Sequence, residues 1–300
     1  MAIPLEGTYT ALVTPFRDEP SQPVDWEAFD ALLERQIAGG VTGVVPCGTT
    51  GESPALSHEE HALVVERAVK RAKGRVQVIA GTGSNSTTEA IAMSQHAESA
   101  GADALMVVVP YYNRPSQEGL YGHFVAVAKS VRAPVVVYNI PARTGVDLAP
   151  ETLARIAEAA PNVIGTKEST GNVLRAQKIV QLLGRRMSVL CGDDALTLAM
   201  VAVGARGVIS VTSNVLPAEV VRATRFALDG AFDEARRRHH ALLPMHEALF
   251  LEASPAPVKA ALAVRRMIPG DSVRMPLAPC TDTTRKILAG LLEGYARGAG

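Results

Sequence analysis

Short apolar runs recur along the chain, separated by longer segments in which apolar residues repeat with a helical period. Each run is dense in valine, isoleucine and leucine, which is typical of strands covered on both faces. The expected strands are 8–13, 42–46, 76–80, 104–109, 134–138, 163–166, 188–191 and 207–211. Eight strands alternating with helices predict an α/β protein whose parallel sheet closes into a (β/α)8 TIM barrel. The rival is an open doubly wound sheet, which requires a phosphate-binding loop where Thr14-Pro15-Phe16 stands.

Helix signals lie between the expected strands. Ser57 with Glu60, and Ser86 with Glu89, have the spacing of capping boxes, in which each side chain bonds the other residue's backbone N–H. Proline opens two further helical patterns. The expected helices include 25–38, 150–159 and 217–228.

After the eighth strand the chain continues with three more segments of helical pattern. These segments are 231–251, 257–267 and 281–295. They predict a small helical C-terminal domain over 231–300, following a catalytic barrel over 1–230. The last helix carries an apolar stripe that is typical of a packing face. The stripe consists of Ile287, Leu288, Leu291, Leu292 and Tyr295.

Composition narrows the classes of partner. Lys plus Arg and Asp plus Glu each number 30, so the formal net charge is zero. This balance gives no electrostatic reason to expect nucleic acid or an anionic membrane as a partner. The one basic run, 236–240, follows Asp233 and Glu234 on a helical pattern, which indicates a solvated helix face.

The cysteines and the N-terminus bear on location. The three cysteines lie far apart without zinc-site spacing, and Cys47 and Cys191 end apolar runs, as small buried residues do. Residues 1–7 show no secretory signal, and no apolar stretch is long enough to span a bilayer. We therefore expect a cytoplasmic protein.

Polar side chains follow the expected strands. In a parallel barrel the active site forms at the carboxyl ends of the strands, so these residues are candidates for chemistry. Each one alone fits ordinary loop chemistry, but their joint placement at one rim favours a site. They are Thr49, Thr50, Tyr111, Tyr112, Tyr138, Arg143, Lys167, Asp193, Asp194 and Ser210.

Lys167 ends the apolar run of the sixth strand. Burial disfavours the charged ammonium form, and a neutral amine is a nucleophile that forms a Schiff base with a carbonyl carbon. The alternative is a structural lysine that pairs with a buried carboxylate. Glu168 is not the obvious partner, because adjacent strand residues point to opposite faces.

The sequence gives less support to metal-dependent or cofactor-dependent chemistry. A metal-dependent aldolase or hydrolase requires a cluster of histidine and carboxylate ligands. The seven histidines form no HExxH motif, and His58 and His61, spaced i and i+3, also fit a helix surface. Asp193-Asp194 argues against a phosphorylated substrate. The GTG at 81–83 is no phosphate loop or dinucleotide fingerprint, so we expect no metal, NAD, PLP or ATP.

Several strings resemble one known family over essentially the whole chain. They are GTTGE at 48–52, YYNRPSQEGLYGHF at 111–124, YNIPARTG at 138–145, GTKESTG at 165–171 and GVISVTSN at 207–214, with SPAPVKAAL and RMPLAP in the C-terminal part. They resemble the dihydrodipicolinate synthase family of pyruvate-dependent class I aldolases, a superfamily that includes N-acetylneuraminate lyase. The resemblance implies a lyase of lysine (diaminopimelate) biosynthesis, which condenses pyruvate with L-aspartate 4-semialdehyde to 4-hydroxy-tetrahydrodipicolinate.

The resemblance also implies roles for individual residues. Lys167 is expected to form the Schiff base with pyruvate, and Tyr138 to carry protons, linked to Thr49 and Tyr112. The residue matching Tyr112 reaches in from a neighbouring subunit in this family, whose members form homotetramers. Thr50 and the backbone near Ile209 are expected to hold the pyruvate carboxylate.

Arg143 is expected to bind the carboxylate of the second substrate, because its planar fork matches a carboxylate. An arginine in PARTG together with GTTGE favours the synthase over branches that act on sugar acids or hydroxy-oxo acids. Those aldolases, and a non-catalytic ligand-binding paralogue, remain the alternatives. Ala142 stands where serine is common in the family.

A second site is implied by the lysine-inhibited members of the family, in which L-lysine binds at a dimer interface. The positions that match this pocket are Ser53, His58, His61, Asn85, Glu89 and Tyr111. We expect feedback inhibition by L-lysine, although Pro54 departs from the small residue expected there. Glu89 and Asn85 also fit a helix cap and a turn.

Overall fold

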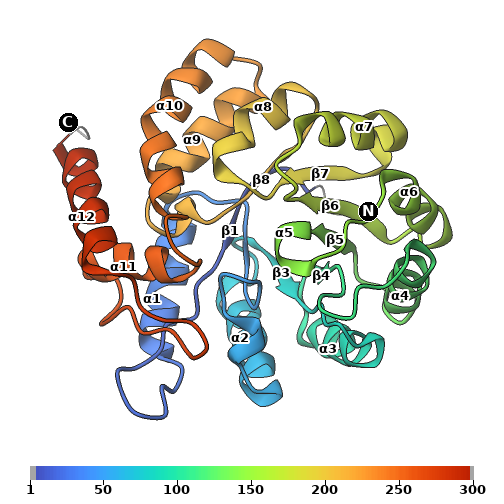
Figure 1. Cartoon of the computed structure of the whole chain (residues 1–300), viewed down its shortest axis with the longest axis horizontal. Coiled ribbons are helices and arrows are strands. Elements are labelled where there is room, and N and C mark those ends of the chain that lie inside the picture. Colours follow the sequence, from blue (N-terminus) through green and yellow to red (C-terminus); the bar gives the residue numbers. More distant parts are fainter. Residues whose placement is uncertain (1–4, 298–300) are drawn as a thin grey trace.

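The computed structural model describes residues 5–297, apart from the side chains of Arg185, Ala296 and Arg297. Eight parallel strands pair in chain order, and β8 returns to pair with β1, so the sheet is a closed barrel (Figure 1). The strands are β1 (Gly7–Ala11), β2 (Gly43–Val45), β3 (Gln77–Gly81), β4 (Ala104–Val108), β5 (Val135–Asn139), β6 (Val163–Glu168), β7 (Ser188–Cys191) and β8 (Gly207–Ser210). The barrel expected from the apolar runs is confirmed, with strand ends shifted by at most two residues.

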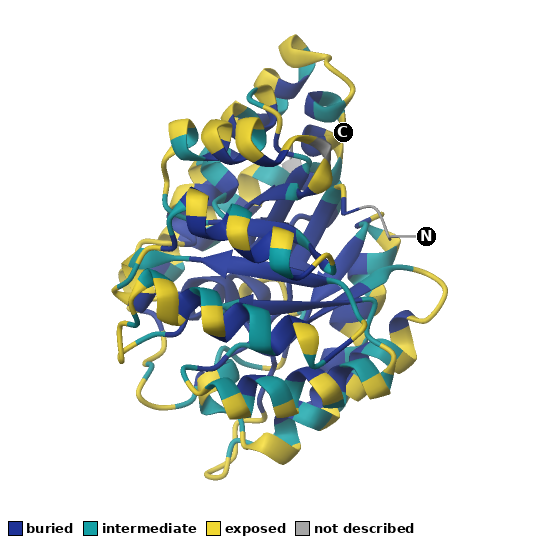
Figure 2. Cartoon of the chain, turned by 90° about the vertical axis from the view of Figure 1, so that its right-hand side faces the viewer, coloured by how far each residue is buried: buried dark blue, intermediate teal, exposed yellow. Residues whose placement is uncertain are grey.

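Helices surround the barrel and cover the outer face of its strands. They are α1 (Trp26–Ala38), α2 (His58–Ala72), α3 (Thr87–Ala100), α4 (Gln117–Lys129), α6 (Pro150–Ala159), α7 (Val173–Leu183), α8 (Thr197–Ala202) and α9 (Pro217–Leu228). The short α5 (Pro141–Thr144) follows β5 directly. The strands are buried, whereas the outer helices expose one side and bury the other (Figure 2). The core therefore lies inside the barrel and between the strands and the helices.

One of the two expected capping boxes forms completely. Ser57 Oγ accepts from the backbone N–H of Glu60, and the Glu60 carboxylate accepts from that of Ser57. At α3 only the first half forms, because Ser86 accepts from the backbone of Glu89 while the Glu89 side chain turns elsewhere. The second capping box was therefore a wrong prediction.

Three helices, α10 (Phe232–Ala248), α11 (Ala256–Val264) and α12 (Asp282–Arg297), follow the barrel and lie beside α1 and α9 (Figure 1). On α12, Leu288 and Leu292 are buried and the Tyr295 hydroxyl donates to Ala241 O at 2.7 Å, but Ile287 is 43% exposed. The expected packing stripe is therefore narrower than predicted. The division into domains at residue 230 stays a prediction.

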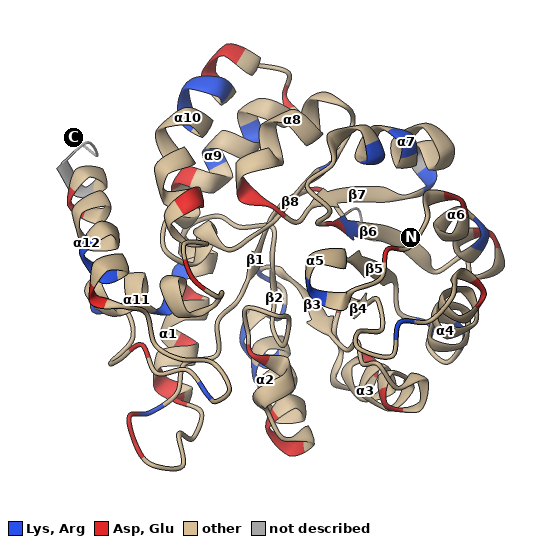
Figure 3. Cartoon of the chain, in the orientation of Figure 1, with Lys and Arg blue, Asp and Glu red and all other residues tan. Residues whose placement is uncertain are grey.

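The basic run on α10 is only partly a solvated face. Arg237 and Arg238 pair with Glu234, but His239 is buried, its Nε2 lying 3.0 Å from Ala195 O. A fully solvated face was thus a wrong interpretation, because α10 packs this histidine against the end of the barrel. Over the whole molecule, basic and acidic segments are interspersed (Figure 3). No helix within residues 5–297 is long and apolar enough to cross a membrane.

Candidate active site

A cavity of about 450 Å³ opens among the loops that follow β2, β3, β4 and β5. Thr49, Tyr138 and Arg143 line it, together with five of the six residues expected to form a lysine site. These five are Ser53, His58, His61, Glu89 and Tyr111. The two sites expected from the sequence therefore share one continuous space. Apolar side chains that carried no sequence signal complete the wall: Met93, Met106, Val108 and Ile140.

Lys167 and Tyr138 face each other at the carboxyl ends of neighbouring strands. They are register partners of β6 and β5, and both are buried, with 5% and 4% of their surface exposed. Lys167 Nζ lies 4.2 Å from the centroid of the Tyr138 ring. Within residues 5–297, no carboxylate pairs with Lys167. The structural alternative, a buried ion pair, is thus absent from the described part of the chain.

Space for the Lys167 side chain depends on Gly192, in the loop after β7. A Cβ atom at Gly192 would lie 3.0 Å from Lys167 Cε and 1.8 Å from Ser169 Oγ. Both distances are shorter than ordinary contacts, so a side chain here would displace Ser169 and would also press on Lys167. Ser169 Oγ is itself buried and makes no hydrogen bond to any described residue. Sequence reasoning missed both residues, because only the fold brings them to Lys167.

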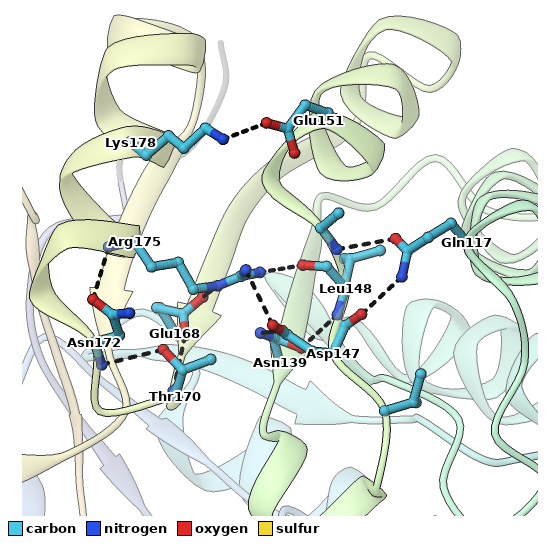
Figure 4. Close-up of polar contacts among 12 residues, drawn as sticks. Gln117, Asn139, Asp147, Leu148, Glu151, Glu168, Thr170, Asn172, Arg175 and Lys178 are labelled. Atoms are coloured by element: carbon cyan, nitrogen blue, oxygen red, sulfur yellow. Dashed lines mark hydrogen bonds and ion pairs between the residues drawn. The ribbon is translucent and has the colours of Figure 1, made fainter.

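Glu168 turns away from Lys167, as the alternation of strand residues predicts. Its Oε2 accepts from Arg175 Nε at 2.9 Å and its Oε1 from the backbone N–H of Thr170 at 2.8 Å. Arg175 lies in the first turn of α7 and also pairs with Asp147 (Figure 4). Both oxygens of Glu168 are therefore used on the outer face of the barrel.

A buried ion pair holds the loop that contains Thr49 and Thr50. Glu52, at φ +55°, pairs with Lys259 of α11, and neither side chain is exposed. Burial lowers the pKa of Lys259 to about 8, with Glu52 opposing the shift. The backbone N–H of Arg274 also donates to Glu52, at 2.9 Å. Thr50 is buried in this loop and does not line the cavity.

Arg143 lies in α5 and reaches the cavity from the side of β5. It is exposed and makes no ion pair within the part of the chain that the structure describes. A free guanidinium at the edge of a cavity can bind a carboxylate through two parallel hydrogen bonds. The arrangement thus offers an amine, a phenol, a hydroxyl and a cation at one end of the barrel.

Four residues expected at the active site do not line its cavity: Lys167 and Thr50, which are buried, and Tyr112 and Ile209. Tyr112 is 89% exposed and has φ +71°, a conformation that is rare for residues with a side chain. Ile209 lies in the middle of β8, where it pairs with Tyr9. Neither lines the cavity.

The candidates for the lysine site surround His58 and Glu89, whose Nε2 and Oε1 lie 3.2 Å apart. Glu89 also accepts from the hydroxyl of Ser84. These contacts explain why Glu89 does not complete the capping box. Burial, and then the charge of Glu89, raise the pKa of Tyr111.

His61 differs from His58 in its surroundings. It is buried, its Nε2 lies 2.8 Å from Gly81 O, and burial lowers its pKa. Asn85 lies outside the cavity lining, and its carbonyl accepts from the Asn113 side chain. Within residues 5–297, no three His, Cys, Asp or Glu side chains gather in a way that could hold a metal ion.

Comparisons with known proteins cover nearly the whole chain. Residues 4–294 match the model of the dihydrodipicolinate synthetase family. A 4-hydroxy-tetrahydrodipicolinate synthase of Sorangium cellulosum is 56% identical over 96% of this chain and 95% of its own length. One from Geotalea daltonii is 47% identical over 97% of this chain and 98% of its own.

Solved structures that are similar to this chain come from the same family as its sequence relatives. Dihydrodipicolinate synthase from Aquifex aeolicus is 46% identical, with a TM-score of 0.95 over 97% of this chain and 98% of its own. The Acinetobacter baumannii enzyme, described as chloride inhibited and complexed with pyruvate, is 39% identical, with a TM-score of 0.94 over 97% and 99%. The Cyanidioschyzon merolae enzyme with lysine bound is 35% identical, with a TM-score of 0.93 over 97% and 98%.

Proposed function

This chain belongs to the dihydrodipicolinate synthetase family, and we propose that it condenses pyruvate with L-aspartate 4-semialdehyde through an imine on Lys167. The product is 4-hydroxy-tetrahydrodipicolinate, an intermediate of lysine biosynthesis. The observation that carries the imine is the position of Lys167. Its amine is buried, lies against the ring of Tyr138 and has no carboxylate partner within residues 5–297. A buried amine without a partner is suited to attack a carbonyl carbon.

The chemistry then runs through the imine. The Lys167 amine adds to the ketone carbon of pyruvate, and loss of water gives the iminium. This iminium withdraws electrons, so the pyruvate methyl group loses a proton and becomes an enamine. The enamine carbon attacks the aldehyde of the second substrate. Attack by the amino group of that substrate then displaces Lys167 as a free amine and closes the ring.

Tyr138 carries protons in these steps, a role supported by the position of Lys167 Nζ 4.2 Å from the centroid of its ring. Thr49 lines the same cavity as Tyr138, and we propose that it orients the Tyr138 hydroxyl. Thr50 and the backbone at Ile209 hold the pyruvate carboxylate. Arg143 binds the carboxylate of the semialdehyde, which its free guanidinium at the cavity supports. The scheme uses no metal and no organic cofactor.

We also propose a homotetramer in which Tyr112 serves the site of a neighbouring subunit. The supporting observation is that this tyrosine is 89% exposed and held at φ +71°. A large aromatic side chain in a strained conformation at the surface is expected where it fills a partner. The free cysteines Cys47, Cys191 and Cys280 suit a cytoplasmic location.

L-Lysine is the proposed inhibitor. Ser53, His58, His61, Glu89 and Tyr111 line one part of the cavity, where a carboxylate and a tyrosine hydroxyl suit the ammonium groups of an amino acid. A related enzyme has been solved with lysine bound. Asn85 does not line this cavity, so its proposed contribution to the lysine site is smaller than that of the other five residues. An unchanged rate at saturating lysine would remove the effector from the proposal.

A coupled assay tests the function. The purified protein is mixed with pyruvate, L-aspartate 4-semialdehyde, the downstream reductase and NADPH, and NADPH loss is followed. A rate that requires both substrates and disappears in Lys167→Ala supports the proposal. If no rate is seen but borohydride traps pyruvate on the protein, the second substrate is a sugar acid or hydroxy-oxo acid. Binding of pyruvate without trapping or turnover indicates a non-catalytic paralogue.

A further inference from the structure

The outer face of the barrel carries a polar network directly behind Lys167 and Tyr138. These two residues are register partners, and so are the residues that follow them, Glu168 and Asn139. Successive strand residues point to opposite faces, so Glu168 and Asn139 face the helix layer. They are 2% and 1% exposed. Any group that holds these two side chains also fixes the strand ends from which Lys167 and Tyr138 project.

The guanidinium group of Arg175 holds the end of β6. Arg175 Nε donates to Glu168 Oε2 at 2.9 Å, and its Nη2 donates to Leu148 O (Figure 4). Its Nη1 lies 3.4 Å from Asp147 Oδ2. Only 10% of the Arg175 side chain is exposed, so its positive charge is committed to these partners.

The loop that contains Asp147 and Leu148 also holds the end of β5. Asn139 Nδ2 donates to Asp147 Oδ1 at 2.8 Å, and Asn139 Oδ1 accepts from the backbone N–H of Leu148 at 3.2 Å. Gln117 in turn donates to Asp147 O at 2.8 Å and fixes the loop to α4. Both strand ends are therefore joined through residues 147–148 and Arg175.

We propose that Glu168, Arg175, Asp147 and Asn139 form a positioning network that holds the Lys167 amine beside the Tyr138 side chain for proton transfer. The inference rests on the proposed function of Lys167. A planar guanidinium forms several directed hydrogen bonds at once. Glu168 and Asn139 are buried and Asp147 is 51% exposed, so the network resists distortion mainly at the two strand ends. Displacement of a reacting group by about 1 Å can cost on the order of 100-fold in rate. None of the four residues contacts substrate in this scheme.

The test compares Arg175→Met with Lys178→Met. Lys178 lies on the same helix and pairs with Glu151 of α6, but these side chains are 51% and 59% exposed. Both variants thus remove one basic charge from α7, and only Arg175→Met touches the network. Pyruvate is trapped with borohydride to count competent sites, and kcat is divided by that count. A purely structural loss lowers the count, whereas mispositioning lowers kcat per counted site.

Arg175→Met is expected to lower kcat per trapped site by about 10- to 100-fold, with KM for pyruvate within about threefold of wild type. Lys178→Met is expected to stay within about twofold. Because Arg175→Met leaves Glu168 buried and unpaired, the double variant Glu168→Gln/Arg175→Met is measured as well. The side-chain amide of the introduced glutamine would retain an acceptor for the Thr170 N–H without the stranded charge.

Three outcomes are decisive. A loss in kcat per site in the double variant, with the control unaffected, supports the positioning role. Wild-type kcat per site in both network variants overturns it while the proposed function stands, because wild-type enzyme is trapped and turns over in parallel. Absence of trapping in the wild type overturns the proposed function, and the positioning role with it.

Discussion

Two buried lysines in this chain resemble each other closely and are held differently. Lys167 is 5% exposed and Lys259 is not exposed at all. Each side-chain nitrogen lies over an aromatic ring, Lys167 Nζ at 4.2 Å from the Tyr138 centroid and Lys259 Nζ at 4.0 Å from that of Phe16. Burial and ring contact therefore do not distinguish them.

The polar partners of the two lysines differ. Lys259 Nζ pairs with Glu52 and donates to Ser272 O at 2.9 Å. Lys167 has neither kind of partner within residues 5–297, and the nearest acid in sequence, Glu168, is bound to Arg175 instead. A paired ammonium braces the fold, whereas an unpaired amine beside a cavity is free to react. The difference supports a structural role for Lys259 and the proposed catalytic role of Lys167.

The largest expected effect is on activity, at Lys167. Lys167→Met removes the amine and keeps an apolar stem of similar length, so turnover is expected to fall by more than about 1,000-fold. Stability is expected to hold or rise, because a buried amine without a partner is lost. The coupled rate and the urea midpoint measure the two effects. A rate close to wild type would remove Lys167 from the chemistry.

Lys259→Met is expected to lower the stability of the protein, unlike Lys167→Met. It leaves the Glu52 carboxylate buried without its partner, which costs about 3–5 kcal/mol. The double variant Glu52→Gln/Lys259→Met is the control, and it is expected to recover most of the loss, because no charge is stranded. Urea unfolding measures both. If Lys259→Met unfolds at the wild-type midpoint, the ion pair does not brace the loop.

Tyr138→Phe sharpens the comparison further, because it gives Lys167 a ring without a hydroxyl, as Lys259 already has in Phe16. The ring contact survives and the proton carrier is lost. We expect kcat to fall by about 100-fold, the lower end of what acid–base catalysis contributes. Borohydride should still trap pyruvate, since the amine remains. An unchanged kcat would show that the hydroxyl carries no proton.

His123 extends the comparison to a third buried base, which like Lys167 pairs with no carboxylate within residues 5–297. Burial lowers its pKa from 6.5 to about 4. Between these values the unfolded chain binds a proton that the folded chain does not, so stability falls as pH falls from about 6.5 towards 4. The loss from this residue reaches about 2 kcal/mol at pH 5. His123→Gln should reduce the difference between urea midpoints at pH 7 and pH 5. An equal difference in both proteins would contradict the assignment.

Hydrophobic periodicity was sufficient to predict the barrel, because a strand covered on both faces needs a continuous apolar run. The same signal misplaced strand ends. Strand β6 continues through Lys167 to Glu168, since backbone pairing with β5 and β7 does not stop where apolar residues do. The second capping box was also a wrong prediction, because the Glu89 side chain pairs with His58 and accepts from the Ser84 hydroxyl instead. Sequence spacing contains no information on such contacts.

The meeting of candidate residues was predictable to the extent that strand ends converge, and their roles stay predictions. Lys167 and Tyr138 follow neighbouring strands and do meet. The supports of the site were not predictable, because Lys259 and Arg274 reach Glu52 from the far end of the chain. Gly192 likewise carries no signal in isolation, since its small size matters only beside Lys167.

The most direct test asks which lysine reacts. The protein is incubated with pyruvate, reduced with borohydride and digested, and the modified peptide is identified by mass spectrometry. Our account predicts one adduct, on the peptide that contains Lys167, and an unmodified peptide around Lys259. An adduct on Lys259 or on an exposed lysine instead, or no pyruvate-dependent adduct at all, would contradict the assignment of the chemistry to Lys167.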